Sequence, residues 1–584
     1  MPEGLHAAMS LADFAVSNRR DACATRTSRL DAEGKIARNA AMKHASFFQT
    51  FRALLLALVA LVASKPAAHA ASEAAAKPNI VFILCDDLGY GDVRALNSEG
   101  KIATPNMDAL ARDGMIFTDA HGSSAVCSPT RYSLLTGRYN WRTRMQSGVL
   151  GGLSPHLIDP SRLTVASLLK KHGYATACIG KWHLGMDWPK KAGDFKPGDN
   201  IEKGADGWKV DFSKPIANGP TAAGFDYYFG ITASLDMVPY TFIENDRVAV
   251  VPTVDKKFPM MFGRAGETTR EGPAAAGFEA VDVLPTLTRK AVEYIGARKK
   301  SDAPFFLYLP LNAPHTPIAP TREWQEKSGL NPYADFVMET DACIGDVLRA
   351  VEKSGAAGNT LFIVTSDNGC SPEAKFSELL AKGHNPSYVF RGTKADIWDG
   401  GHHIPFIARW PGKTKAGTHS DALVCLGDLL ATCAEIVGEK LPDNAGEDSV
   451  SFLPALTGNP DSKGLRETIV HHSVTGRFAI RDKKWKLELC PGSGGWSNPR
   501  DPAATKQGLP SVQLYDIEDD IEETKNVQAE HADVVARLTK LLERQVADGR
   551  STPGTPQQND TKIDIWKKHL DAPGKPKPKK DVGN

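Results

Sequence analysis

The sequence lacks several features that would assign its class directly. Its nine cysteines are scattered over 584 residues with no C-x-x-C pair, which implies neither a zinc site nor a disulfide framework. Neither sign of charge dominates, because the formal net charge is +1, so nothing suggests binding to nucleic acid or to an unusually acidic partner. No internal repeat is present. A chain of this length can instead hold one large core and a smaller domain.

A short apolar run near the N-terminus is typical of an export signal. After Met42 the chain carries Lys43 and Arg52, then the apolar run 53–63, then Ala68-His69-Ala70. The run falls well short of the ~20 residues that a membrane-spanning helix needs. We therefore expect a signal peptide over 42–70, cleaved after Ala70, a periplasmic or secreted mature chain and no membrane span. Residues 1–41 are expected to be a disordered upstream extension that follows from a start codon placed too early.

Short apolar runs alternate with helical stretches from residue 77 to about residue 440. This alternation predicts an α/β domain whose sheet is covered on both faces. The expected strands are 79–84, 175–179, 305–309 and 361–365. Each of them ends at polar or charged residues, which is where ligands gather in open α/β sheets.

The C-terminal third has a different pattern. After a linker at 442–448, short strands are expected at 467–472, 478–481, 485–489 and 513–515, with an amphipathic helix near 529–546. We expect a small α+β domain over 449–550. Residues 551–584 are rich in proline and polar residues, a composition that predicts a disordered tail.

The segment from Cys127 to Gly137 predicts a short helix with a cysteine and an arginine at its entrance. Ser128 suits the N-cap, Pro129 the first helical position and Gly137 a left-handed stop. The unpaired N–H groups and the positive end of the helix dipole favour an anion there, and Arg131 can donate two hydrogen bonds to it. The same pattern fits a buried structural cysteine beside a helix cap.

Two predicted strands end in pairs of oxygen ligands. The first is followed by Asp86 and Asp87, and the strand at 361–365 is followed by Asp367 and Asn368. Adjacent carboxylates repel unless a cation lies between them, so these pairs predict a hard divalent metal. A solvated turn is the alternative for either pair taken alone.

Three further polar residues follow strand ends. Lys181 and His183 are two positions apart after the strand at 175–179, so a cation and a proton-transfer group can face one pocket. His315 follows the strand at 305–309 and lies in a loop stiffened by Pro314 and Pro317. A surface lysine and packed core histidines are the plain alternatives.

Taken together, these segments resemble the type I sulfatases. The chain carries that family's C-x-P-x-R string at 127–131, T-G-R at 136–138 and G-K-W-H-L-G at 180–185, in family order. The resemblance implies an alkaline-phosphatase-like α/β/α sandwich with a smaller α+β C-terminal domain built on an antiparallel sheet. It also implies oxidation of Cys127 to formylglycine by a formylglycine-generating enzyme, and Ca²⁺ as cofactor. The implied metal ligands are Asp86, Asp87, Asp367, Asn368 and the modified Cys127.

The last block of the resemblance departs from the family pattern. Sulfatases usually read K-x-x-x-x-E-G-G-x-R-x-P here; Lys394 is kept, but Asp399 replaces the glutamate and His403 the arginine. By resemblance Lys394 contacts the substrate sulfate. Substrate-binding roles are also expected for Ser234, Trp398 and His402.

The resemblance implies a mechanism. Hydrated formylglycine attacks sulfur with help from Asp367, and Arg131, Lys181, Lys394 and the metal neutralise charge. His315 protonates the leaving alcohol, and His183 is the base when sulfate is released.

The expected substrates are sulfated carbohydrates or aryl sulfates. Sugars are favoured because Trp188, Trp208, His384 and Trp398 are expected on exposed loops, where aromatic faces suit sugar rings. Two alternatives remain open. One is a phosphonate monoester or phosphodiester hydrolase of the same superfamily, and the other is an inactive sulfated-glycan binding protein.

Overall fold

The computed structural model describes residues 77–191, 204–298, 303–458 and 465–571. The expected upstream extension at 1–41, the expected signal peptide at 42–70 and residues 572–584 of the expected tail lie outside the described residues. Within the described ranges, no helix combines the length and the apolar composition needed to cross a bilayer.

The centre of the molecule is a parallel sheet built from the four predicted strands. β1 (Asn79–Asp86) pairs with β10 (Phe305–Pro314) on one side and β11 (Thr360–Ser366) on the other, and β4 (Ala175–Lys181) pairs with β10. Every residue of β10 and β11 is buried. Burial on both faces explains why these strands read as continuous apolar runs rather than as alternating patterns.

Additional strands extend this sheet to ten strands within the described residues, in the order β13-β2-β12-β11-β1-β10-β4-β5-β6-β7. β12 is antiparallel to β11. The added strands are β2 (Met115–Phe117), β5 (Tyr227–Ile231), β6 (Ile243–Glu244), β7 (Arg247–Val248), β12 (Phe406–Arg409) and β13 (Thr418–Ser420). Two small pairs lie apart, β3 (Ala120–His121) with β14 (Val424–Cys425), and β8 (Val254–Lys256) with β9 (Gly272–Ala274).

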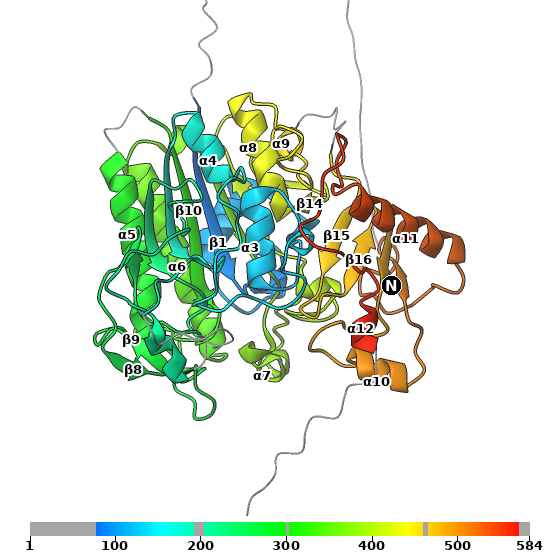
Figure 1. The fold of residues 1–584 in the computed structure, drawn as a ribbon, viewed down its shortest axis with the longest axis horizontal. Helices are drawn as coiled ribbons and strands as arrows, with labels where there is room; N and C mark the ends of the chain where they lie inside the picture. Colours follow the sequence, from blue (N-terminus) through cyan, green and yellow to red (C-terminus); the bar gives the residue numbers. More distant parts are fainter. Residues whose placement is uncertain (1–76, 192–203, 299–302, 459–464, 572–584) are drawn as a thin grey trace, which may run out of the picture. The chain divides into compact units, whose positions relative to one another are not determined.

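Two groups of helices cover the sheet (Figure 1). One group is α2 (Pro105–Arg112), α5 (Val283–Arg298) and α6 (Pro332–Lys353). The other is α3 (Cys127–Thr136), α4 (Val165–Lys171) and α8 (Leu429–Val437). Shorter helices are α7 (Phe376–Ala381), α9 (Leu453–Leu456), α10 (Asp501–Lys506) and α12 (Lys568–Asp571). The predicted α/β/α sandwich is confirmed.

The C-terminal region forms a four-stranded antiparallel sheet in the order β15-β16-β17-β18. Its strands are β15 (Ile469–His472), β16 (Phe478–Arg481), β17 (Trp485–Glu488) and β18 (Gln513–Asp516), and α11 (Ala532–Ala547) packs on β16 and β17. Leu538 and Leu542 of α11 are fully buried in a core that this sheet shares with the helix. The smaller α+β architecture predicted for this region is also confirmed.

The prediction that the chain is disordered from residue 551 is wrong for residues 551–571. Arg138 Nη2 pairs with Asp560 Oδ1 at 2.9 Å, Arg142 Nη1 donates to Asn559 Oδ1 at 3.0 Å, and Ile565 is buried. Composition predicted disorder because apolar residues are few. The segment is held instead by buried arginines of the large α/β domain, which only the tertiary structure brings beside it.

Candidate functional site

The polar residues at the ends of the central strands meet at one edge of the sheet. β1, β4, β10 and β11 run parallel, so their carboxyl ends lie at the same edge. Asp86 and Lys181 are the last residues of β1 and β4. The loops that follow the strands carry Asp87, His183, His315, Asp367 and Asn368, all of them buried.

Helix α3 brings Cys127 and Arg131 to the same place. The helix begins at Cys127, one residue before the predicted N-cap, and Val126 takes the cap position without a side-chain hydrogen bond. Ser128 Oγ accepts from the backbone N–H of Leu150 at 3.1 Å, so its hydroxyl anchors a neighbouring loop rather than the helix start. Gly137 ends the helix with φ 63°, the left-handed conformation predicted for it. Cys127 Sγ donates to Asp86 Oδ1 at 3.7 Å.

Three cations pair with three carboxylates in this buried site. Arg131 donates from Nε and Nη2 to Asp367 Oδ2, at 3.0 and 2.7 Å. Lys181 Nζ lies 2.5 Å from Asp86 Oδ2, and Lys394 Nζ lies 2.8 Å from Asp87 Oδ1. Asp87 has φ 65°, a strained conformation for a residue with a side chain. Such strain persists because the surrounding contacts fix the turn.

The pKa values of the two central carboxylates, Asp86 and Asp367, shift in opposite directions. Burial alone would raise the pKa of Asp86, but Lys181, followed by His315 and Arg131, holds this pKa well below its usual range. The pKa of Asp367 is raised, first by burial and then by the negative charge of Asp86. A cation between the two carboxylates would remove this repulsion.

The ligand set fits a hard divalent cation. The ligand atoms of Asp86, Asp87, Cys127 and His315 all lie within 4.8 Å of one another. Asn368 Nδ2 donates to Asp87 Oδ1 at 2.7 Å, while the buried Asn368 Oδ1 has no hydrogen-bond partner among the described residues. A buried amide oxygen without a partner is costly, and a metal ion would satisfy it.

The two histidines differ in the ring nitrogen that is available. His183 Nε2–H donates to the Leu150 carbonyl at 2.7 Å, which leaves Nδ1 as an unprotonated nitrogen without a partner in the described structure. Burial, then Lys181 and Arg131, hold the pKa of His183 well below its usual value, so the ring is neutral. His315 Nδ1–H donates to the Thr316 carbonyl at 2.6 Å, and His315 Nε2 lies 3.7 Å from Asp87 Oδ2.

Ser234 is placed beside this group of residues. The backbone N–H of His183 donates to the carbonyl of Thr232, two residues before Ser234. The Ser234 hydroxyl is buried and has no hydrogen-bond partner among the described residues.

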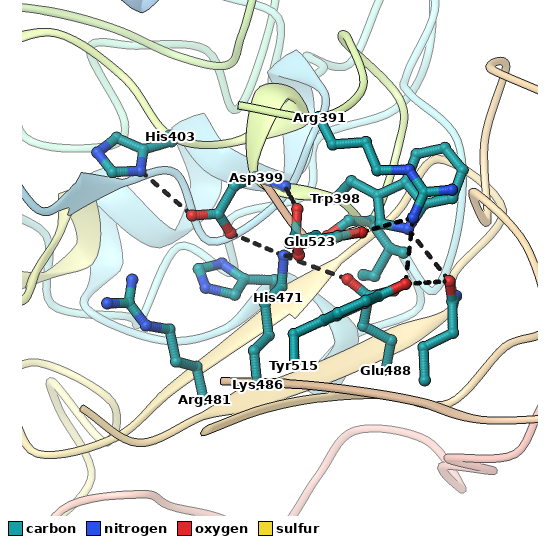
Figure 2. Close-up of polar contacts among 12 residues, drawn as sticks. Arg391, Trp398, Asp399, His403, His471, Arg481, Lys486, Glu488, Tyr515 and Glu523 are labelled. Carbon is teal, nitrogen blue, oxygen red and sulfur yellow. Dashed lines mark hydrogen bonds and ion pairs between the residues drawn. The ribbon is translucent and has the colours of Figure 1, made fainter. Parts of the chain in front are cut away.

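The expectation that Trp398 lies exposed on a loop is wrong, and Trp398 and His402 both pack against other side chains. Trp398 is 1% exposed, with Arg391 stacked 3.6 Å from its ring centroid (Figure 2). His402 is fully buried and stacks on His471 at a centroid distance of 3.7 Å. The aromatic argument for a sugar fails for Trp188 and His384 as well, because both are buried. These rings pack inside the protein, since the loops that carry them fold back onto the core.

Two features of the site were missed in the sequence. Asp92 lies in the D-D-L-G-Y-G-D string, and its carboxylate accepts from the Gly89 backbone N–H at 2.8 Å, from Tyr333 Oη at 2.5 Å and from His384 at 2.8 Å. This network also reaches the turn that carries Asp87, because Tyr333 Oη lies 3.2 Å from the Asp87 carbonyl oxygen. Asn312 on β10 is buried with neither amide atom paired in the described structure. An amide inside an apolar strand was the available signal for it.

Comparison with known proteins places these residues in a family context. A family model described as Sulfatase matches residues 78–439. The N-acetylgalactosamine-6-O-sulfatase of Bacteroides thetaiotaomicron is 32% identical over 507 residues, which cover 80% of this chain and 93% of the relative. Arylsulfatase A of Homo sapiens is 30% identical over 514 residues, which cover 84% of this chain and 90% of the relative.

Solved structures show the same relationship. A Bacteroides thetaiotaomicron structure, described as part of the metabolism of multiple glycosaminoglycans, superposes with a TM-score of 0.68 at 31% identity and covers 80% of this chain and 99% of its own. The phosphonate monoester hydrolase of Agrobacterium radiobacter superposes with a TM-score of 0.52 at 19% identity, over 81% of this chain and 96% of its own, and shows a shared fold alone. The chain therefore belongs to the type I sulfatase family and is a sulfuric ester hydrolase.

Proposed function

We propose that this sulfatase is an exported enzyme that removes sulfate from sulfated carbohydrates, using Ca²⁺ and a formylglycine formed from Cys127. One observation carries the proposal: three carboxylates and three cations, all buried and paired, converge on the first residue of α3. Their formal charges cancel, so one bound divalent cation would give the site a net positive charge. That charge suits the anionic sulfate ester.

The state of Cys127 supports the modification. Burial raises the pKa of the Cys127 thiol to about 12, so at neutral pH an unmodified cysteine stays protonated and is a poor nucleophile. Formylglycine supplies a hydrated aldehyde with two hydroxyl groups, one to attack sulfur and one to expel the sulfate afterwards. A thiol has no second hydroxyl. Maturation therefore requires a formylglycine-generating enzyme as a partner.

Asp86, Asp87, Asp367 and Asn368 would hold the metal. Their ligand atoms are hard oxygens, which favour Ca²⁺ over Zn²⁺. The unpaired Asn368 Oδ1 is the atom that supports a metal most directly, because no described protein donor reaches it. A bound Ca²⁺ would supply charge neutralisation at the sulfate oxygens.

The chain's own residues perform the remaining tasks. Arg131, Lys181 and Lys394 place positive charge where the sulfate oxygens gather charge during attack. His183 Nδ1 carries a free lone pair and can take up a proton. His315 donates Nδ1–H to a carbonyl, so in the imidazolium form the second proton is on Nε2, from which it can pass to the leaving alcohol.

The relatives favour a sugar substrate. One is named for removal of a 6-O-sulfate from N-acetylgalactosamine, and a solved structure is described as part of glycosaminoglycan metabolism. The identities of 32% and 31% extend over most of both chains. We therefore propose sulfated amino sugars and their oligosaccharides as the substrates.

A mass measurement on residue 127 tests the proposal. The chain is produced with and without a formylglycine-generating enzyme, and the peptide containing Cys127 is analysed beside turnover of a sulfated sugar and of its phosphate analogue. We expect aldehyde at residue 127 only in the co-produced protein, with turnover confined to that sample and faster on the sulfate. An active enzyme with an intact thiol at 127 would overturn the mechanism. Faster turnover of the phosphate would support the phosphonate or phosphodiester alternative instead.

A further inference from the structure

The segment 391–403 carries Lys394 and is held in a strained shape. Ala395, the next residue, has φ 81°, a conformation that a residue with a side chain rarely adopts. Its N–H donates to the Ala125 carbonyl at 2.8 Å, and its carbonyl accepts from the Val474 N–H at 3.0 Å. The backbone beside Lys394 is therefore held between the entrance to α3 and the C-terminal domain.

The C-terminal domain also holds the residues that follow. Asp396 Oδ1 accepts from the backbone N–H groups of Trp496 and Ser497, at 2.8 and 3.0 Å. The Ile397 N–H donates to the Ser493 carbonyl at 2.8 Å. Strain of this kind is kept only when surrounding contacts over-determine the backbone, and here most of those contacts come from the second domain.

Lys486 of β17 is the cation at the centre of this contact (Figure 2). It is fully buried, and Nζ donates to the Ile397 carbonyl at 3.0 Å and to Asp399 Oδ1 at 2.7 Å. Nζ also lies 2.5 Å from Glu523 Oε1 and 3.2 Å from Glu488 Oε1. One ammonium group thus joins the Lys394 segment to two carboxylates of the C-terminal domain.

Glu523 of the C-terminal domain also contacts the Lys394 segment directly. Its Oε2 accepts from the Asp399 N–H at 2.7 Å, and its carbonyl accepts from Arg391 Nη1 at 2.8 Å. The segment is therefore held at its first residue, at Ile397 and at Asp399. All three contacts involve groups from β17 or from the loop after β18.

Of the other described cations near these carboxylates, Arg391 donates to the Tyr515 hydroxyl and to the Glu523 carbonyl rather than to a carboxylate oxygen. Arg481 is directed at Asp119, with nitrogens 2.7 and 3.0 Å from the carboxylate oxygens. The neighbouring His402 and His471 stack on each other, and their ring nitrogens contact the carbonyls of Ile397 and Gly122 rather than Glu488 or Glu523. Loss of Lys486 would leave buried carboxylates unpaired, and the segment would rearrange to relieve them.

We propose that Lys486 is a positioning residue for Lys394, through which the C-terminal domain sets the geometry of the catalytic site. The proposal rests on the proposed contact between Lys394 and the substrate sulfate. Lys486 itself touches neither substrate nor metal ligand, and acts through Ile397, Asp399 and the strained backbone at Ala395.

A double-mutant cycle tests this coupling. Lys486→Met and Lys394→Ala are made singly and together, and kcat/KM, the inhibition constant of inorganic sulfate and the melting temperature are measured. Lys484→Met is the matched control, because Lys484 lies beside the same strand, is part-exposed and pairs with Asp516 and Glu518. Misplacing a catalytic group by about 1 Å can lower the rate by about 10²-fold, so Lys486→Met should lower kcat/KM by about 10- to 100-fold.

The expected signature is non-additive. In the Lys394→Ala background, adding Lys486→Met should lower kcat/KM only slightly. It should not change the inhibition constant of inorganic sulfate in that background. Lys486→Met should lower the melting temperature by the same amount whether residue 394 is lysine or alanine. Lys484→Met should keep the wild-type kcat/KM, inhibition constant and melting temperature. Equal losses of kcat/KM in both backgrounds would show that Lys486 acts on general stability, and would overturn the proposal. So would an unchanged kcat/KM in Lys486→Met.

A second variant keeps the test decisive if Lys486→Met does not fold. Asp399→Asn weakens the same contact while leaving Lys486 paired with Glu523 and Glu488, and it enters the same cycle. The role of Lys394 is read separately. If Lys394→Ala alone retains wild-type kcat/KM, the assigned contact with sulfate is wrong, and the positioning role falls with it.

Discussion

Replacing His315 by alanine distinguishes a proton donor from a residue that merely holds the sulfate. His315 Nδ1–H is engaged by the Thr316 carbonyl at 2.6 Å, so only Nε2 can deliver a proton. Nε2 lies 3.7 Å from Asp87 Oδ2, and His315, at 8% exposure, is the least buried of the site residues. A sugar alkoxide is a strong base and needs protonation as it leaves, whereas nitrophenolate leaves unaided.

The expected loss of rate follows from the role of His315 as a general acid. General acid catalysis contributes about 10²–10⁴-fold, equivalent to about 2.7–5.4 kcal/mol of activation free energy. We expect His315→Ala to lower kcat/KM by this factor on a sulfated sugar and by much less on nitrophenyl sulfate. Initial rates of both substrates with the same enzyme preparation provide the comparison, and the formylglycine content of each preparation is measured as a control.

A second variant makes the result specific. His315→Asn keeps a polar side chain but cannot act as an acid, so it should behave as the alanine variant does. Equal losses on both substrates would refute the reasoning, because they would show that His315 positions the sulfate instead of delivering a proton.

Three other outcomes are expected. Lys394→Ala should lower kcat/KM on sugar and nitrophenyl sulfates alike, by about 10²–10³-fold, because it removes charge from the sulfate itself; a loss confined to one substrate would contradict this. Chelation should abolish turnover, and Ca²⁺ but not Zn²⁺ should restore it, because the four ligands are hard oxygens; rescue by zinc alone would favour the alternative hydrolase. Arg142→Met should lower the free energy of unfolding by about 3–5 kcal/mol at pH 7, because it leaves the buried Asp448 unpaired. Arg142 overcomes burial and lowers the pKa of Asp448, so the wild-type pair stabilises the fold above about pH 4 and loses this contribution as pH falls further. Melting temperatures from pH 7 to pH 2 should show that loss in the wild type and a flatter profile in the variant.

The local pattern of apolar and polar residues was sufficient to predict the main strands of the fold. The predicted strands at 79–84, 175–179, 305–309 and 361–365 all form, each extended at one or both ends. Apolar runs are informative here because strands buried on both faces are mostly apolar along their length. Their polar ends then mark the site, since parallel strands bring their carboxyl ends together.

The local sequence pattern did not predict which individual side chains are buried. Trp398 and His402 follow Lys394 closely in sequence, yet they face the C-terminal domain and are enclosed by Arg391 and His471. The ordered segment 551–571 was missed for a related reason. Its partners Arg138 and Arg142 are more than 400 residues away in the chain.

The sequence by itself therefore determined the four central strands of the sheet, the order of the site motifs and the types of the reacting groups. These depend on short-range periodicity and on spacing within single loops. Only the tertiary structure decided how the charges pair, which nitrogen of His183 is free and that Lys486 reaches the Lys394 segment from the second domain. Such pairings join residues far apart in the chain, and their energies depend on distance and burial, which no local pattern encodes.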